Sequence, residues 1–179
     1  MFPISLAAQW QAAHKLQLTS SLTTWLTDNG SLTEKLKQLP GTFHVQLLQQ
    51  TKSFADDHEY DALGVAKQSV WIREVLLHVN QTPMVYARSI LPVNQPPQSE
   101  LHPVRLGTTP LGEVLFNHPH IAPKPIEVAH FSSTSPVAAL NFKLHNKSRP
   151  LWGRRRVFPV TDSAILVSEV FLSPAPCYA

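Results

Sequence analysis

The sequence predicts an α+β fold built on one antiparallel β-sheet. Three observations favour it: apolar and polar residues alternate along several segments, these segments come in pairs joined by short turns, and helix signals concentrate near the N-terminus. Strands that alternate regularly with helices would indicate a parallel sheet, and that order is not found. At 179 residues and 43% hydrophobic content, residues 1–179 are expected to form one domain with a sizeable core.

Two short helices are expected near the N-terminus. The first runs through Leu22, Trp25 and Leu26, where Ser20 or Ser21 is suited to cap the helix and the Asp-Asn-Gly turn at 28–30 ends it. The second begins after Ser31, because Glu34 completes the signal of a capping box. A Pro-Gly pair at 40–41 then ends this helix.

The following segments predict mainly strands. Residues 43–47 alternate between apolar and polar side chains, which indicates a half-buried strand, whereas residues 51–68 are polar and acidic and are expected to form a loop. The strongest sheet signal is the pair 70–79 and 84–91, which predicts an antiparallel hairpin. The proline-rich stretch 92–103 is typical of a loop.

The second half of the chain predicts one helix and another hairpin. A Thr-Pro pair at 109–110 supplies an N-cap and a first helical position for the helix LGEVLF. Residues 117–150 are rich in Pro, His, Ser and Asn and are expected to be irregular, with one strand at 137–144. Two alternating segments, 154–160 and 164–172, predict the hairpin.

Composition argues against several functional classes. The formal charge of +3 is scattered along the chain except for the run from Arg154 to Arg156, which we expect to be a solvated surface, so no nucleic-acid partner is predicted. No apolar run approaches the roughly 18 to 20 residues needed to cross a bilayer. The start of the sequence lacks an export-signal pattern. We therefore expect a cytoplasmic protein without stable membrane insertion.

Motifs for cofactors and covalent catalysis are also missing. The nine histidines form no pattern with metal-ligand spacing, and neither GxGxxG nor a P-loop is present. The single cysteine, Cys177, cannot form an internal disulfide and has no plausible histidine partner for nucleophilic catalysis. The sequence therefore predicts no metal and no organic cofactor.

Two charged residues fall on strand faces that are otherwise apolar. Alternation places Arg73 on one face with Trp71 and Val75, and it places Glu169 in the last strand with Val167. Because burying an unpaired charge is costly, Arg73 must meet either an internal carboxylate or an anionic ligand, which its planar fork can bind through two hydrogen bonds. Pairing with Glu169 is the simplest internal alternative, and it stays open.

Three further residues are weaker candidates for binding an anion. The helix starts at Leu32 and Leu111 offer free N–H groups to a carboxylate, but every helix has such a start, so they count only in combination with Arg73. Arg88 is a candidate for a second anion ligand, although an exposed position at a sheet edge is the expected one.

Five blocks of the sequence resemble the chorismate pyruvate-lyase family of bacterial ubiquinone biosynthesis. They are WIREVLL at 71–77, MVYARSILP at 84–92, LGTTPLGEVLF at 106–116, LWGRRRVF at 151–158 and SEVFLSPAPCY at 168–178. In this resemblance, the family's substrate-contacting arginine falls on Arg73 and its acidic residue on Glu169. Its main-chain contacts fall on Leu111 and on Leu32, the latter often a methionine in the family. Residues 117–150 are longer than the family's usual link.

The resemblance implies a monomer in which flap-like segments, expected at residues 28–42, enclose an internal ligand cavity. It also implies conversion of chorismate to 4-hydroxybenzoate and pyruvate without metal or organic cofactor, the first committed step of ubiquinone biosynthesis. Arg73 and the Leu111 N–H are then expected to hold the ring carboxylate, and Glu169 to contact the hydroxyl end. The alternative is a non-catalytic effector-binding domain, since such domains of bacterial regulators resemble the same fold.

Overall fold

The centre of the fold is a seven-stranded sheet, which a computed structural model of residues 1–179 shows in the order β1-β5-β6-β7-β4-β3-β2. Every neighbouring pair is antiparallel, so the predicted α+β class is confirmed. The strands are β1 (Gln11–Ala12), β2 (Phe43–Ser53), β3 (Val70–Val79), β4 (Thr82–Pro92), β5 (Glu127–Phe131), β6 (Leu151–Val160) and β7 (Ser163–Phe171).

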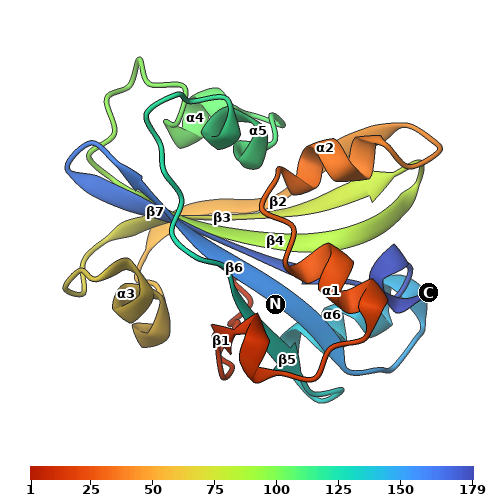
Figure 1. The fold of residues 1–179 in the computed structure, drawn as a ribbon. Helices are drawn as coiled ribbons and strands as arrows, with labels where there is room; N and C mark the ends of the chain where they lie inside the picture. Colours follow the sequence, from red (N-terminus) through yellow and green to blue (C-terminus); the bar gives the residue numbers. More distant parts are fainter.

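Helices cover both faces of this sheet. They are α1 (Ser20–Leu26), α2 (Leu32–Lys37), α3 (Asp57–Leu63), α4 (Pro103–Leu106), α5 (Leu111–Phe116), α6 (Pro136–His145) and the 3-10 turns η1 (Ala13–Lys15) and η2 (Pro176–Tyr178). Figure 1 shows α2, α4 and α5 together on one side of the sheet and α3 on the other. None of these helices has the length and apolar character that a membrane span requires.

Strand alternation separates the core into two layers. On one face, α1 and α2 pack with Val75 and Leu77 of β3, and α4 and α5 pack with Leu91 and Val167. The opposite face packs against α3, α6 and the N-terminal segment. Successive residues of β3 and β4 are buried on both faces, which explains the long apolar runs in these central strands.

Both predicted hairpins are confirmed. The turn between β3 and β4 consists of residues 80–81, and the turn between β6 and β7 of residues 161–162. Asn80 has a φ of 56° and Asp162 a φ of 57°, the left-handed region that Asn and Asp tolerate better than most residues. The Asn80 side chain also accepts a hydrogen bond from the Thr42 N–H at 3.0 Å, which joins the hairpin to the start of β2.

The helix starts differ in detail from the prediction. Ser31 caps α2 as expected and accepts a hydrogen bond from the Glu34 N–H at 3.3 Å, whereas α1 is capped by Thr19. At α5 the expected N-cap Thr109 is wrong, because Pro110 occupies the N-cap position and the helix begins at Leu111. A proline has no side-chain acceptor, so the first N–H groups of α5 are left without a cap.

The predicted loop at residues 51–68 is wrong. Strand β2 continues to Ser53, since it pairs with β3 from Phe43 to Ser53 with one bulge at Leu48, and helix α3 follows. A capping box joins Asp56 and Glu59 at the start of α3, and Gly64 ends it with a φ of 69°. The residues of the capping box and the terminating glycine are both signals of a helix that can be read in the sequence.

The segment 117–150 is more ordered than expected. It contains β5, which pairs with β6, and α6, which occupies the range 137–144 that was predicted as a strand. Ser135 caps α6 and Pro136 takes its first position, an arrangement that favours a helix over a strand.

Arg88 is neither at an exposed edge nor available to an anion. It lies on central strand β4, is 2% exposed and donates to both carboxylate oxygens of Glu59 at 2.8 Å. Glu74 and Tyr86 complete this buried cluster, in which the Tyr86 hydroxyl donates to Glu74 at 2.5 Å. The cluster attaches α3 to the sheet on the face opposite Arg73.

Candidate functional site

Two adjoining pockets lie on the sheet face that α2 and α5 cover. One is lined by Arg73, Leu111 and Glu169, which places three of the four predicted site residues together. The other is lined by Leu32 and Glu169, and both pockets share Gly112, Val167 and Glu169. Each has a volume of about 20 Å³, about the space of one water molecule. Ligands of the size of a substituted benzene ring therefore require the lining to move outward.

The strand register explains why there is a pocket between Arg73 and Glu169. Arg73 of β3 pairs with Ser89 of β4, while Glu169 of β7 pairs with Ala87 of β4. The two charged residues are thus two strands apart, about 10 Å across the sheet. Ser89 and Ala87 lie between them on the same face and line the pocket with side chains that are too short to fill it.

Arg73 is a buried cation without a carboxylate partner. Its side chain donates to Gln50 Oε1 at 3.0 Å and to the Thr109 carbonyl at 3.3 Å, both neutral acceptors. The residue is 2% exposed, and burial lowers the pKa of Arg73 to about 10, so it remains protonated at neutral pH. The alternative in which Arg73 pairs with Glu169 is wrong, because Arg73 contacts only neutral acceptors and Glu169 pairs with another arginine.

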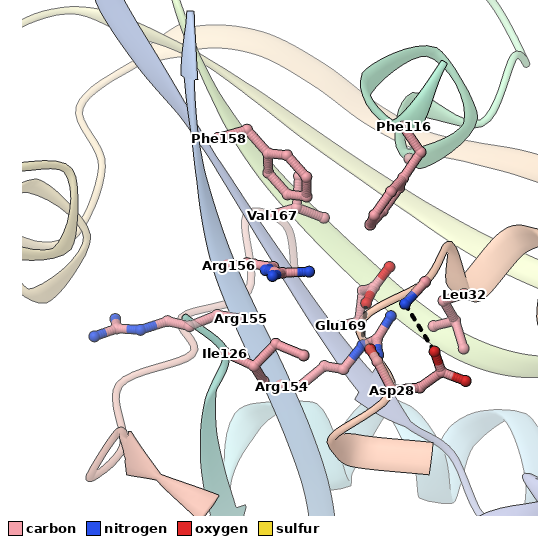
Figure 2. A pocket seen from close by; sticks show the side chains of 12 residues that line it. Asp28, Leu32, Phe116, Ile126, Arg154, Arg155, Arg156, Phe158, Val167 and Glu169 are labelled. Carbon is pink, nitrogen blue, oxygen red and sulfur yellow. Dashed lines mark hydrogen bonds and ion pairs between the residues drawn. The ribbon is translucent and has the colours of Figure 1, made fainter. Parts of the chain in front are cut away.

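Glu169 pairs instead with Arg154. Arg154 Nε donates to Glu169 Oε2 at 2.7 Å, because these residues lie directly opposite each other in the β6–β7 hairpin. No protein group donates to the other oxygen, Oε1. Figure 2 shows the Glu169 carboxylate among the residues that line the pocket next to Leu32. One carboxylate oxygen is therefore free to accept a hydrogen bond from a ligand.

The two helix starts occupy different positions. Leu111 opens α5 and lines the pocket of Arg73, and the first N–H groups of this helix have no side-chain cap. Leu32 opens α2 and lines only the adjoining pocket. An anion at Arg73 is therefore near the start of α5, whereas the start of α2 borders both compartments, through Leu32 in the adjoining pocket and Thr33 in the pocket of Arg73.

The prediction that Arg154, Arg155 and Arg156 form a solvated surface is wrong. Arg154 and Arg155 are buried, and Arg155 pairs with Glu127 of β5. Figure 2 shows Arg154 and Arg156 pointing toward the pocket and Arg155 pointing away from it. Arg156 donates only to the carbonyls of Lys124 and Asn29, and burial together with the neighbouring Arg154 lowers the pKa of Arg156. Cations therefore outnumber carboxylates around the two pockets.

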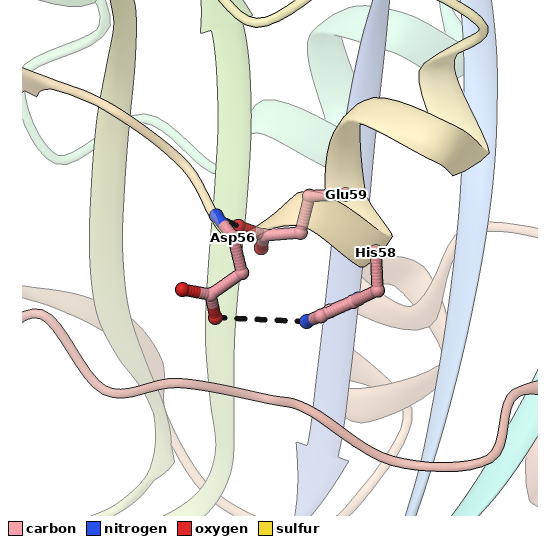
Figure 3. Close-up of side chains that lie close together, drawn as sticks. All are labelled: Asp56, His58 and Glu59. Carbon is pink, nitrogen blue, oxygen red and sulfur yellow. Dashed lines mark hydrogen bonds and ion pairs between the residues drawn. The ribbon is translucent and has the colours of Figure 1, made fainter.

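One group of side chains has the composition of a metal site but is otherwise engaged. Asp56, His58 and Glu59 lie together at the start of α3 (Figure 3). Both oxygens of Glu59 accept from Arg88, and one also accepts from the Asp56 N–H. The Asp56 carboxylate accepts from Ser5 at 2.7 Å. These contacts assign the group to the attachment of α3 and the N-terminal segment.

Comparison with known proteins identifies the family. The family model described as chorismate lyase matches residues 4–179. A protein of Idiomarina loihiensis named probable chorismate pyruvate-lyase is 40% identical over 99% of this chain and 92% of its own length. A protein of the same name from Pseudoalteromonas translucida is 36% identical over 99% of this chain and 98% of its own. The chain belongs to the chorismate lyase family.

Solved structures with similar folds include the effector domain of one regulator and a putative transcriptional regulator. The effector domain of PhnF from Mycobacterium smegmatis matches 81% of this chain and 90% of its own with a TM-score of 0.58 and 20% identity. A putative transcriptional regulator from Streptomyces coelicolor matches 74% of this chain and 88% of its own with a TM-score of 0.56 and 22% identity. At these identities the likeness shows that this chorismate lyase family member shares a fold with them.

Besides Arg156, which was expected on a solvated surface, three residues of the site were not predicted from the sequence. Ala87 and Ser89 line the pocket on β4, and they are the small residues among bulky neighbours on one face of that strand. Arg154 contacts Glu169, and counting back from the 161–162 turn places these two residues opposite each other. Both signals are readable in the sequence of this chorismate lyase family member once the hairpins are recognised.

Proposed function

We propose that this protein converts chorismate to 4-hydroxybenzoate and pyruvate, and that the pocket of Arg73 and Glu169 binds the reacting ring. The observation that carries the proposal is the buried guanidinium of Arg73, which has no carboxylate partner and lines the same pocket as Glu169. A substrate with a ring carboxylate supplies the missing anion. Family membership and relatives of nearly the same length support the same reaction.

The reaction does not require the protein to form a covalent bond with the substrate. The ring C–O bond to the enolpyruvyl group breaks with its electron pair going to the departing oxygen, and the hydrogen on the hydroxyl-bearing carbon is lost as a proton. The methylene carbon of the departing enolpyruvate takes up one proton to give pyruvate, and the ring becomes aromatic, which supplies the driving force. The protein then needs to position the ring, neutralise its charge and exclude water. No nucleophile is required, and the pocket lining contains no serine or cysteine paired with a histidine.

Each predicted site residue has a role in this proposal. Arg73 and the uncapped N–H groups at Leu111 hold the ring carboxylate, where a bidentate charged contact fixes the ring plane. Glu169, two strands away, accepts a hydrogen bond from the ring hydroxyl through its free oxygen. The Leu32 N–H and Arg156 lie in the adjoining compartment and attract the second carboxylate of the substrate.

The closed pocket implies that a segment moves when the ligand enters. Both compartments hold about 20 Å³, so a ring with its substituents does not fit until the lining opens. We assign this movement to residues 28–42, the segment that carries α2 over the pocket. Product then leaves only after the segment reopens, which makes release slow relative to chemistry.

The remaining expectations belong to the same proposal. We expect a cytoplasmic monomer that acts on chorismate at the start of ubiquinone biosynthesis and needs neither nucleic acid nor metal nor organic cofactor. The alternative, a non-catalytic effector-binding domain, rests on the likeness in fold to bacterial regulators, and fold alone does not give function. The two readings differ in one property, turnover.

The test is an assay of the purified protein with chorismate. Protein dialysed against a chelator is mixed with chorismate, and 4-hydroxybenzoate and pyruvate are quantified separately. We expect equimolar products in many-fold excess over protein, and loss of most activity in Arg73→Ala. Binding of 4-hydroxybenzoate without turnover would favour the effector-binding alternative, and restoration of activity only by a divalent ion would contradict the metal-free mechanism.

A further inference from the structure

Arg154 joins the candidate carboxylate to the segment that covers the pocket. Its Nε donates to Glu169 Oε2 at 2.7 Å, while its Nη1 donates to the Asp28 carbonyl at 2.8 Å and to the Trp25 carbonyl at 3.4 Å. The Trp25 carbonyl belongs to the end of α1, and the Asp28 carbonyl belongs to the covering segment 28–42 that leads into α2. One planar guanidinium, 6% exposed, therefore touches Glu169 and the covering segment at the same time.

The hydrogen bonds of Arg154 can fix the orientation of the Glu169 carboxylate. A guanidinium is rigid and planar, so the direction of its Nη1 bonds fixes the direction of its Nε bond. The Trp25 and Asp28 carbonyls therefore set the plane of Arg154, and Arg154 sets the position of Glu169 Oε2. When residues 28–42 move outward, Arg154 loses the Asp28 carbonyl, which is the closer of the two acceptors that fix its plane.

Other contacts hold the same segment without touching Glu169. Lys35 Nζ donates to the Thr24 carbonyl at 2.5 Å and to Asp28 Oδ2 at 2.8 Å. Arg156 Nη1 donates to the Asn29 carbonyl at 3.0 Å. Lys35 thus offers a matched comparison, because it restrains the segment but has no contact with the carboxylate.

We propose that Arg154 is a positioning residue that makes the orientation of Glu169 depend on closure of residues 28–42, through its contact with the Asp28 carbonyl. The inference rests on the proposed role of Glu169 in the reaction. With the segment closed, Arg154 holds Oε2 and leaves Oε1 directed at the ring hydroxyl. With the segment open, Glu169 loses this orientation, so the chemical step waits until the pocket excludes water.

The first experiment separates chemistry from product release. Single-turnover conversion of chorismate is measured for wild type, Arg154→Gln, Arg154→Lys and Lys35→Gln, together with binding of 4-hydroxybenzoate by calorimetry. We expect Arg154→Gln to slow the chemical step roughly ten- to hundredfold. We expect Arg154→Lys to recover part of the rate, since an ammonium still reaches one partner but cannot hold both in a fixed geometry. Lys35→Gln should change the chemical step less than about twofold.

The second experiment asks whether Arg154 acts through Glu169. In a double-mutant cycle, Arg154→Gln should have little further effect in a Glu169→Gln background. Amide hydrogen exchange of residues 26–32 should become faster in both Arg154→Gln and Lys35→Gln. If Arg154→Gln does not fold, Arg154→Lys is carried through the same cycle.

The possible failures are distinguishable. A wild-type rate in Glu169→Gln would remove the proposed role of Glu169, and with it the basis of the inference. If Glu169→Gln is slow but Arg154→Gln keeps the wild-type rate, the role of Glu169 stands and the positioning role of Arg154 is wrong. Equal losses in Arg154→Gln and Lys35→Gln would mean that closure alone controls the rate, which would also overturn the proposal.

Discussion

Arg73 and Glu169 point to the same face of the sheet from strands that β4 separates, and no ion pair joins them. Their separation leaves a buried cation at one end of the pocket and a carboxylate with a free oxygen at the other. A ring with an acidic group opposite a hydroxyl group satisfies both ends.

Substitution of Arg73 is expected to weaken binding of 4-hydroxybenzoate in a graded way. Arg73→Ala removes both the charge and the fork and should weaken binding about ten- to hundredfold, the value of a charged hydrogen bond. Arg73→Lys keeps the charge, so its affinity for 4-hydroxybenzoate should lie between those of wild type and Arg73→Ala. Titration calorimetry measures the effect. An alanine variant with wild-type affinity would show that Arg73 has only a structural role.

Filling the gap on β4 is expected to abolish binding while the fold remains. Ala87→Leu and Ser89→Val place larger side chains between Arg73 and Glu169, in the space where the ring is proposed to lie. Ala164→Leu, on β7 outside both pockets, is the control. Calorimetry with 4-hydroxybenzoate and thermal unfolding are compared. If the β4 variants are folded and still bind the product, the ring lies elsewhere.

The sheet was more predictable than the segments around it. Alternation and turn residues identify β3, β4, β6 and β7, because these strands pair within hairpins and their register follows from local sequence. Helix α6 was missed because its apolar residues follow neither period cleanly, with Phe142 52% and Leu144 37% exposed. Its cap at Ser135 and the capping box of α3 were the readable signals.

Two residues of the candidate site could be selected from the local sequence of their own strands. Arg73 and Glu169 are conspicuous because a charge interrupts an apolar strand face. What lies between them depends on which strands become neighbours, and the pairing of β4 with β7 joins segments that are far apart in the sequence. The ion-pair partners of Arg88 and Arg155 also lie on other elements, at Glu59 and Glu127, so their burial could not be read from their own strands.

The buried pair of Arg88 and Glu59 is expected to stabilise the fold without taking part in the reaction. Arg88→Met leaves two buried carboxylates without their cation and should lower the free energy of unfolding by about 3 to 5 kcal/mol. Lys67→Met, which removes an exposed pair with Asp57, should have little effect. Urea unfolding provides the comparison. A small loss in Arg88→Met would contradict the structural role assigned to the cluster.

Stability is expected to fall in mild acid because of two histidines. Burial is the main cause that lowers the pKa of both His78 and His145 in the folded protein. The unfolded chain therefore binds more protons than the folded chain as the pH falls below about 6.5, and the free energy of unfolding decreases there. Urea unfolding at pH 7.5 and pH 5.5 measures the decrease. His78→Gln together with His145→Gln should reduce the difference, and an unchanged difference would assign it to other groups.

The most direct test of the proposed function compares wild type with Glu169→Gln, using both chorismate turnover and binding of 4-hydroxybenzoate. Glutamine keeps the shape of the side chain but removes its charge, at the end of the pocket away from Arg73. We predict that wild type releases equimolar 4-hydroxybenzoate and pyruvate, and that Glu169→Gln lowers kcat by a larger factor than it weakens product binding. An unchanged kcat with only a lower unfolding temperature would contradict the assignment of Glu169 to the reacting end of the ring.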